Sequence, residues 1–196
     1  MPSSSKSPYD KITSIDVQLA AIFYPILIEH AKRKMRLTYG DLVSRGKELN
    51  PTNEVAQNAI PVSTGRRLDV VRMFTNERNL PDITSLVIGK SSGECGDGFT
   101  RSFDPEEVRE AVFSFDWSGI SSEFDGFVAS AKKSLIRRKR IDKLAATALM
   151  SEYFYAHRAS LPDWIKEHRE TVIELIEEGF SPETAYSQVL EGGHFC

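Results

Sequence analysis

Few residues of this sequence could form a catalytic centre. The four histidines show no spacing typical of a metal site: His30, His157, His168 and His194. Cys95 and Cys196 lie too far apart in the sequence to indicate a zinc motif or a disulfide framework. The sequence shows no Ser–His–Asp set and no pair of carboxylates whose spacing indicates acid–base catalysis. We therefore expect a non-catalytic protein that uses neither a metal nor a cofactor.

Basic side chains are the residues whose spacing does indicate a function. From Ala131 to Lys143 the formal charge is +6, whereas residues 144–196 carry −6 and the whole chain −3. If this run is helical, each phosphate that its cations neutralise adds a favourable, salt-dependent contribution to binding. The alternative is a solvated helix face that pairs with the acidic tail of this chain or of a second copy. We expect DNA contacts from Lys132, Lys133, Arg137, Arg138, Lys139 and Arg140.

A second group of cations is expected on a helix over residues 63–78. Leu68, Val71 and Phe74 follow one another at intervals of three residues and predict a buried stripe. The other face then carries Arg66, Arg67 and Arg72, which we expect to be exposed and available to DNA. The alternative is that these arginines are only the solvated face of an amphipathic helix.

The elements before this helix are marked by capping signals. A first helix is predicted from an N-cap at Asp16 to about residue 34, with a kink at Pro25 because proline removes one backbone donor. Thr38 and Asp41 form a capping-box pattern that opens a second helix, and Tyr39 lies at its start. We expect Tyr39 to contact DNA; its alternative role is packing.

The region after residue 80 predicts a small hairpin. Residues 83–88 are rich in β-branched and apolar side chains, residues 89–98 contain four glycines, and residues 99–103 could return as a second strand. The order helix, helix, helix, strand, glycine loop, strand is that of a winged helix, which places its third helix in the major groove and its wing on the backbone. Lys90 in the wing is therefore a further candidate DNA contact.

These elements predict a mainly α fold of the α+β class. We expect a disordered lead-in over residues 1–15, a winged-helix domain over 16–120, and a helical domain over 121–196 that contains the basic helix and an acidic C-terminal hairpin. No stretch is long and apolar enough for a membrane span, and no secretory signal opens the chain, so we expect a cytoplasmic protein without membrane partners.

Several of these motifs resemble known proteins. The chain resembles the DNA-binding half of alkylguanine alkyltransferases and their alkyltransferase-like relatives. The motifs that carry this resemblance are Thr38–Leu42, Gly65–Leu68, Pro81, Leu86–Ile88 and Gly98–Phe99. The resemblance implies that Tyr39 helps to rotate a nucleotide and that Arg66 or Arg67 fills the gap. The reactive Pro-Cys-His-Arg stretch of that family is replaced by Pro81-Asp82-Ile83-Thr84, so alkyl transfer is not expected.

The chain also resembles uncharacterised bacterial and phage winged-helix proteins. The shared motifs correspond here to Tyr39–Leu42, Pro81–Val87, Gly96–Phe99 and Phe115–Trp117. The resemblance implies a DNA-related role on a phage or another mobile element. Our leading hypothesis is therefore a DNA-binding protein that contacts mainly phosphates, as a monomer or homodimer. The alternative is an interaction module that inhibits or adapts a host defence or replication enzyme through its acidic C-terminal helices, and a nuclease comes third.

Overall fold

The computed structural model describes residues 9–192 as a mainly helical chain in two compact units. The units divide between Leu135 and Ile136, whereas the sequence predicted a boundary after residue 120. The boundary is later because α7 packs on α1 and so belongs to unit 1. The elements of unit 1 are α1 (Ser14–Lys32), β1 (Leu37–Thr38), α2 (Tyr39–Leu49), α3 (Glu54–Gln57), η1 (Pro61–Ser63), α4 (Thr64–Glu77), η2 (Ile83–Leu86), β2 (Val87–Ile88), α5 (Asp97–Thr100), α6 (Pro105–Ser114) and α7 (Ile120–Ser134).

Helix α1 starts with a capping box one turn before the predicted N-cap. Thr13 is the N-cap: its side chain accepts a hydrogen bond from Asp16 N, and its own backbone N–H donates to the Asp16 carboxylate. Ile12 and Thr13 are buried, so the predicted disordered lead-in is wrong for these residues, while residues 1–8 lie outside the described chain. Pro25 lies inside the helix, as predicted.

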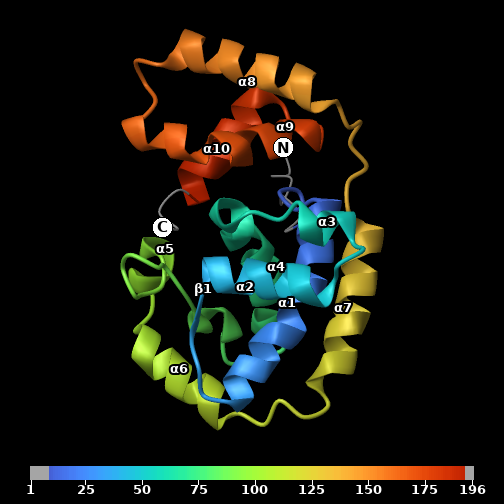
Figure 1. The fold of residues 1–196 in the computed structure, drawn as a ribbon, viewed down its shortest axis with the longest axis vertical. Coiled ribbons are helices and arrows are strands. Elements are labelled where there is room, and N and C mark those ends of the chain that lie inside the picture. The colour runs from blue at the N-terminus through green and yellow to red at the C-terminus, as the bar shows by residue number, and fades with distance from the viewer. Residues whose placement is uncertain (1–8, 193–196) are drawn as a thin grey trace, which may run out of the picture. The chain divides into compact units, whose positions relative to one another are not determined.

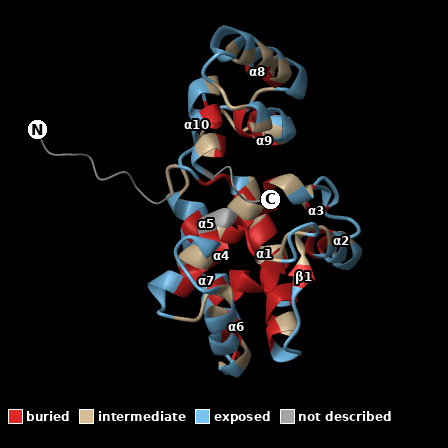
Figure 2. Ribbon diagram, turned by 90° about the vertical axis from the view of Figure 1, so that its left-hand side faces the viewer, coloured by how far each residue is buried: buried red, intermediate tan, exposed pale blue. Residues whose placement is uncertain are grey.

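Helix α1 is the centre of unit 1, with α4 and α7 packed against it (Figure 1). Most of its length is buried (Figure 2). Four aromatic rings meet in this core, and Tyr24 stacks on Phe124 while Phe74 contacts Tyr24, Phe124 and Phe127 edge-on or tilted. Because burial of an aromatic or aliphatic side chain stabilises a fold by about 1.5–3 kcal/mol, this cluster fixes the three helices on one another.

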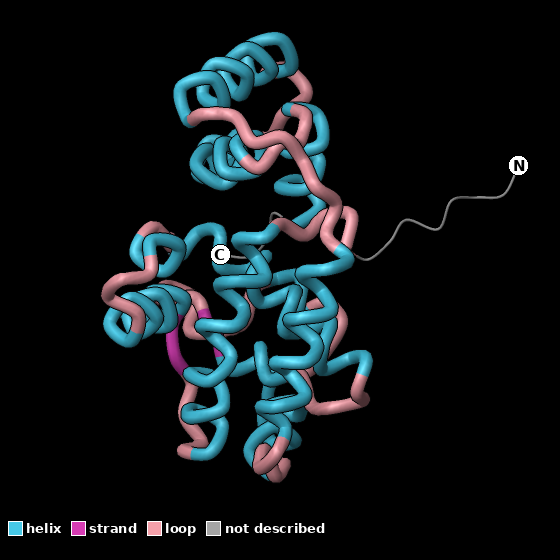
Figure 3. Tube along the Cα trace, turned by 90° about the vertical axis from the view of Figure 1, so that its right-hand side faces the viewer, coloured by secondary structure: helices cyan, strands magenta, loops and turns pink. Residues whose placement is uncertain are grey.

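The strand content differs from the predicted wing. β1 and β2 pair in parallel, with Leu37 opposite Val87 and Thr38 opposite Ile88 (Figure 3). A parallel pair needs a long crossover, and here α2, α3 and α4 supply it. The predicted strand over residues 99–103 is not formed, because Phe99 is buried at the end of the short helix α5 instead. The winged-helix hairpin expected from the glycine spacing is therefore wrong.

Unit 2 contains η3 (Asp163–His168), α8 (Lys143–His157), α9 (Arg169–Glu177) and α10 (Pro182–Gly192). Its own core is formed by Ala146 and Met150 of α8 with apolar residues of α9 and α10. The Tyr186 hydroxyl donates to the Met150 carbonyl oxygen at 3.1 Å and so joins α10 to α8. The unit is a small helical bundle in which the α9–α10 pair forms the predicted C-terminal hairpin.

Phe124→Ala should lower the free energy of unfolding of unit 1 by about 3–5 kcal/mol, since it leaves a cavity inside the aromatic cluster. Phe103→Ala is the matched control, because the Phe103 ring is exposed, and it should cost less than about 1 kcal/mol. Denaturant unfolding followed by Trp117 fluorescence, in a chain carrying Trp164→Phe, would measure unit 1 separately. Equal costs for the two variants would contradict this description of the core.

Candidate nucleic-acid interface

Two of the predicted DNA-contacting arginines bind a buried carboxylate instead. Arg66 Nη2 lies 2.6 Å from Asp16 Oδ2, and Arg67 Nε lies 3.4 Å from Asp16 Oδ1. The Arg66 side chain is 19% exposed and that of Arg67 only 3%. The expectation that both arginines would be exposed is therefore wrong. Their ion pairs with Asp16 join the start of α1 to the start of α4.

Arg67 is buried because the buried face of α4 is wider than the stripe predicted from the sequence. Arg67, Val71 and Phe74 follow the i, i+4, i+7 spacing of one helix face, and all three are buried. The stripe of Leu68, Val71 and Phe74 is buried as predicted, but it is only part of a wider face that includes Arg67. A guanidinium can occupy such a position only with an anionic partner, which Asp16 provides.

The environment of Asp16 has two opposing effects on its pKa. Burial alone would raise it, but the Arg66 and Arg67 guanidinium groups and the hydrogen bonds from Thr13 outweigh burial, so the pKa of Asp16 lies below its usual value. The carboxylate is therefore ionised in the folded protein. Its charge offsets one of the two positive charges that Arg66 and Arg67 bring to the start of α4.

Arg72 is also held by neighbouring side chains. Its Nε donates to Asp82 Oδ2 at 2.8 Å, its Nη2 donates to Thr84 Oγ1 at 3.0 Å, and its guanidinium lies 5.3 Å from the centre of the Phe99 ring. The Arg72 side chain is 25% exposed. Asp82 is thus an anchor for Arg72 and the N-cap of η2.

Tyr39 and Lys90, in contrast, are brought together. Both line a cavity of about 720 Å³ at the start of α2, together with Pro61 and Val62 of η1. An adjoining cavity of about 410 Å³ shares Lys90 and adds Ser44 and Lys47. Gly40, Ser44 and Lys47 share one face of α2 at i, i+4, i+7 spacing, which is the sequence signal that could have identified Lys47 as a further cation of this groove.

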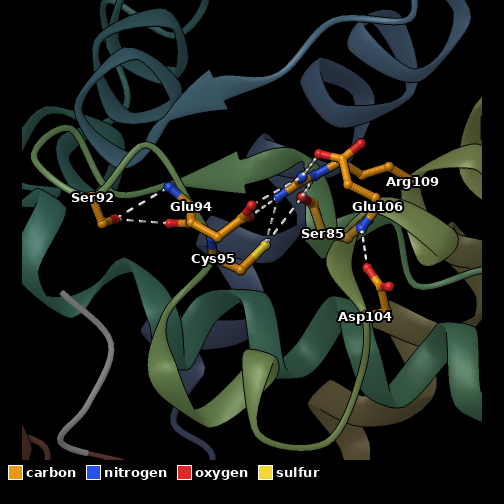
Figure 4. A network of polar contacts seen from close by, with 7 residues as sticks. All are labelled: Ser85, Ser92, Glu94, Cys95, Asp104, Glu106 and Arg109. Carbon is orange, nitrogen blue, oxygen red and sulfur yellow. Dashed lines mark hydrogen bonds and ion pairs between the residues drawn. The ribbon is translucent and has the colours of Figure 1, made fainter.

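The glycine-rich loop next to Lys90 is anchored by Arg109 of α6 (Figure 4). The Arg109 side chain is 1% exposed and forms ion pairs with Glu94 and Glu106. It also donates to the Ser85 carbonyl oxygen at 2.9 Å and to Cys95 Sγ at 3.3 Å. The loop is therefore fixed to η2 and α6, and is not the flexible wing that its glycines suggested.

The surroundings of Cys95 as a whole disfavour a reactive thiol. It is buried, and its Sγ donates to the Ser85 carbonyl oxygen at 3.2 Å. Burial raises the pKa of the Cys95 thiol, against the opposite influence of Arg109. Since the thiolate is the nucleophilic form, this environment disfavours nucleophilic chemistry at Cys95.

The basic run does not form one helix. Helix α7 ends at Ser134, residues 135–142 are non-helical, and Asp142 caps a new helix by accepting from Ala145 N at 2.9 Å (Figure 3). A continuous helix would bring Arg137 within one turn of both Lys133 and Arg140, and like charges at this spacing are destabilising. The predicted basic helix over residues 132–143 is therefore wrong.

The non-helical segment separates its cations into two classes. The Arg138 guanidinium lies 3.9 Å from the centre of the Phe180 ring, and Arg140 Nη2 lies 3.1 Å from Glu178 Oε1. Arg137 and Lys139, which alternate with them, are exposed and form no ion pair in the described part of the chain. Lys132 and Lys133, in the last turn of α7, are likewise exposed and without an ion-pair partner in residues 9–192.

Gly179 allows the segment to lie this close to the α9–α10 turn. Its φ of +87° lies in the left-handed region, and a Cβ added there would stand 2.6 Å from the Lys139 carbonyl oxygen. The Ile141 backbone N–H donates to the Glu177 carbonyl oxygen at 3.1 Å, which fixes the same approach. The exposure of Arg137 and Lys139 thus follows from backbone contacts rather than from chance side-chain positions.

Comparison of the chain with known protein families, curated proteins and solved structures finds no match. Function must therefore be argued from the geometry alone. In residues 9–192, no three His, Cys, Asp or Glu side chains are placed to hold a metal ion. None of the helices in that range has the length and apolar character needed to cross a membrane. The described surface carries four exposed cations between residues 132 and 139, and a groove with an aromatic ring and two lysines.

Asp16→Asn should destabilise unit 1 by about 3–5 kcal/mol at neutral pH, because it leaves the buried Arg67 charge without its partner. Asp41→Asn is the matched control: Asp41 has the same place in the capping box of α2 but is exposed, so we expect less than about 1 kcal/mol.

The same variant should change the pH dependence of stability. Because the pKa of Asp16 is lowered by folding, its contribution is complete above the unfolded value of about 4 and disappears as pH falls through the folded value. Denaturant titrations in acid should therefore show stability falling less steeply in Asp16→Asn than in the wild type. Parallel curves for the two proteins would disprove the ionised, paired state of Asp16.

Proposed function

We propose that this protein is a non-catalytic, phosphate-directed DNA-binding protein. The observation that carries the proposal is the exposure of Lys132, Lys133, Arg137 and Lys139 without ion-pair partners in residues 9–192, within eight consecutive residues of a chain whose net charge is −3. Like charges this close along the chain repel one another unless an anion binds to them, and a phosphate backbone supplies regularly spaced anions. Each phosphate contact releases counterions and so strengthens binding at low salt.

The groove at the start of α2 supports the same proposal for unit 1. Lys90 and Lys47 can contact phosphates there, and the Tyr39 ring offers a surface on which a base could stack. The α4 arginines, in contrast, are engaged with Asp16 and Asp82, so direct reading of base edges by α4 is not part of the proposal. We therefore expect affinity that depends little on DNA sequence.

The winged-helix relationship and the mobile-element origin are part of this proposal as well. Without the short elements α3, η1 and η2, the order α1, β1, α2, α4, β2 is similar to that of winged-helix proteins up to the wing. The motif Phe115–Trp117, on which the resemblance to phage proteins partly rests, turns the chain after α6, where Trp117 Nε1 donates to the Val112 carbonyl oxygen at 2.9 Å. These features favour a distant relationship in which the wing has been replaced by the Arg109-anchored loop.

A second candidate is an interaction module for a host protein. Glu167 and Glu183 of unit 2 are exposed and form no ion pair in residues 9–192, so they could meet a basic surface. We rank this candidate second because acidic groups of α9 and of its C-cap are partly buried beside cations of the same unit, as Glu170 is beside Lys143 and Glu178 beside Arg140. A nuclease is not proposed, since the described residues supply no ligand set for a metal.

Replacing Arg137 and Lys139 together by glutamine should flatten the plot of log K against log salt by up to about 1.8 on duplex DNA, because each phosphate that is no longer neutralised reduces the slope by about 0.9. Replacing Arg138 and Arg140 by glutamine removes the same charge from side chains that already contact Phe180 and Glu178. Both contacts would have to be exchanged for a phosphate, so the slope should change less, even though the Arg140 side chain is 65% exposed. Fluorescence anisotropy of labelled duplex at several salt concentrations measures both slopes.

Two results would overturn the proposal. If the wild-type chain binds no duplex even at low salt, DNA binding is wrong and the interaction module takes its place. If the two double variants flatten the slope equally, the slope follows net charge alone and the assignment to Arg137 and Lys139 is wrong. Circular dichroism of both variants controls for loss of helix.

A further inference from the structure

Helix α8 has more apolar surface than its own unit covers. Only Ala146 and Met150 of its fifteen residues are buried. Leu144 is 83% exposed, Tyr155 68% and Leu149 38%, so one helix holds three of the exposed large hydrophobic residues of the described chain. An amphipathic helix on a small bundle normally turns such side chains inward, and contiguous exposed apolar residues mark interaction surfaces.

Leu144 and Tyr155 form one line along the helix with exposed Ala148 and half-buried Ser151, whereas Leu149 lies off this line. Leu144, Ala148, Ser151 and Tyr155 are separated by four, three and four residues, the spacing of a helix–helix seam. At about 100° per residue, this line lies on the side of α8 away from Ala146 and Met150. We call these four residues the α8 stripe. None of them is charged, and small Ala148 and Ser151 at its centre allow another helix to approach closely.

Positive charge lies on one side of the stripe. A cavity of about 250 Å³ is lined by Ser151 and Tyr155 of the stripe, by apolar residues such as Phe154, and by Lys166 and Arg169. These two are the only charged residues of the lining. Lys166 also pairs with exposed Asp163, whereas Arg169 has no ion-pair partner in residues 9–192.

Negative charge lies on the opposite side. Glu152 follows Ser151 on the helix, and the rotation of about 100° per residue places it across the stripe from Phe154 and the cavity. Its side chain is exposed and has no cationic partner within residues 9–192. At one level of α8, the stripe therefore has cations on one flank and a carboxylate on the other.

We propose that the α8 stripe is a self-association surface on which α8 of a second copy packs in parallel about a twofold axis. In that arrangement each residue of the stripe meets its own counterpart, and opposite flanks of the two helices face each other. Glu152 of each copy then lies opposite Lys166 and Arg169 of the other, so the charge pattern is satisfied twice. An antiparallel pair would instead place like flanks together.

The size of the α8 stripe determines how strong a dimer we expect. Fifteen residues of helix extend over about 22 Å, and one helix seam with a single cavity lies at the low end of the interfaces that hold proteins together. The dimer should therefore be weak and depend on concentration. This inference is independent of the proposed DNA binding, since neither Arg137 nor Lys139 belongs to the stripe.

Sedimentation velocity of the full chain tests it, free of nucleic acid and under reducing conditions, from micromolar to near-millimolar concentration. We expect a monomer–dimer equilibrium that the double variant Leu144→Ser with Tyr155→Ser weakens at least about tenfold. The matched control is Met35→Ser with Leu49→Ser, which removes exposed apolar side chains from unit 1 and should leave the equilibrium unchanged. A monomer at every concentration, or a dimer unaffected by the stripe variant, overturns the proposal.

Charge reversal tests the parallel arrangement. Glu152→Lys and Arg169→Glu should each weaken the dimer, because each places like charges opposite one another twice. An equimolar mixture of the two variants should restore association, since the mixed dimer again pairs opposite charges at both places. If the stripe variant abolishes the dimer but neither charge reversal weakens it, the parallel arrangement is wrong.

Discussion

The carboxylate of Asp16 connects two helices that no local signal in the sequence relates. It closes the capping box of α1 through Thr13, and at the same time it accepts the guanidinium groups of Arg66 and Arg67 at the start of α4. The packing of α4 on α1, with Phe74 against Tyr24, depends on this pair, because Arg67 could not otherwise be buried. Asp16 therefore sets both the geometry of unit 1 and the charge that its surface presents.

The same rule explains where positive charge remains available. Wherever a basic residue is needed to join segments, a carboxylate or an aromatic ring lies beside it, as Glu94 does for Arg109 and Phe180 for Arg138. Cations that join nothing remain exposed, as Arg137 and Lys139 do. The arginines of α4, the helix in the position of a recognition helix, are engaged in internal ion pairs. The cations of the irregular segment after α7 are not, and they remain available to bind DNA.

Capping motifs and apolar spacing in the sequence predicted the elements that are held by short-range interactions. The capping box at Thr38 and the helix expected over residues 63–78, which the structure has at Thr64–Glu77, both follow from interactions within a turn or two. The buried state of Arg67 could not be predicted, because its partner is far away in the sequence. The missing strand over residues 99–103 has a similar cause: the glycines allowed a hairpin, but the long-range contacts of Arg109 and the burial of Phe99 decided the loop.

The two surfaces proposed for unit 2 are formed by different elements. Arg137 and Lys139 belong to the segment that packs on the α9–α10 turn, whereas the stripe runs along α8. Binding of DNA and self-association therefore need not compete for the same residues. If both occur, a dimer carries two copies of the basic segment, and the second copy binds at the high effective concentration that the first contact creates. A dimer that is weak in free solution would then form more readily on DNA, where the duplex concentrates the chains, and its affinity would depend on salt more steeply than that of a single chain.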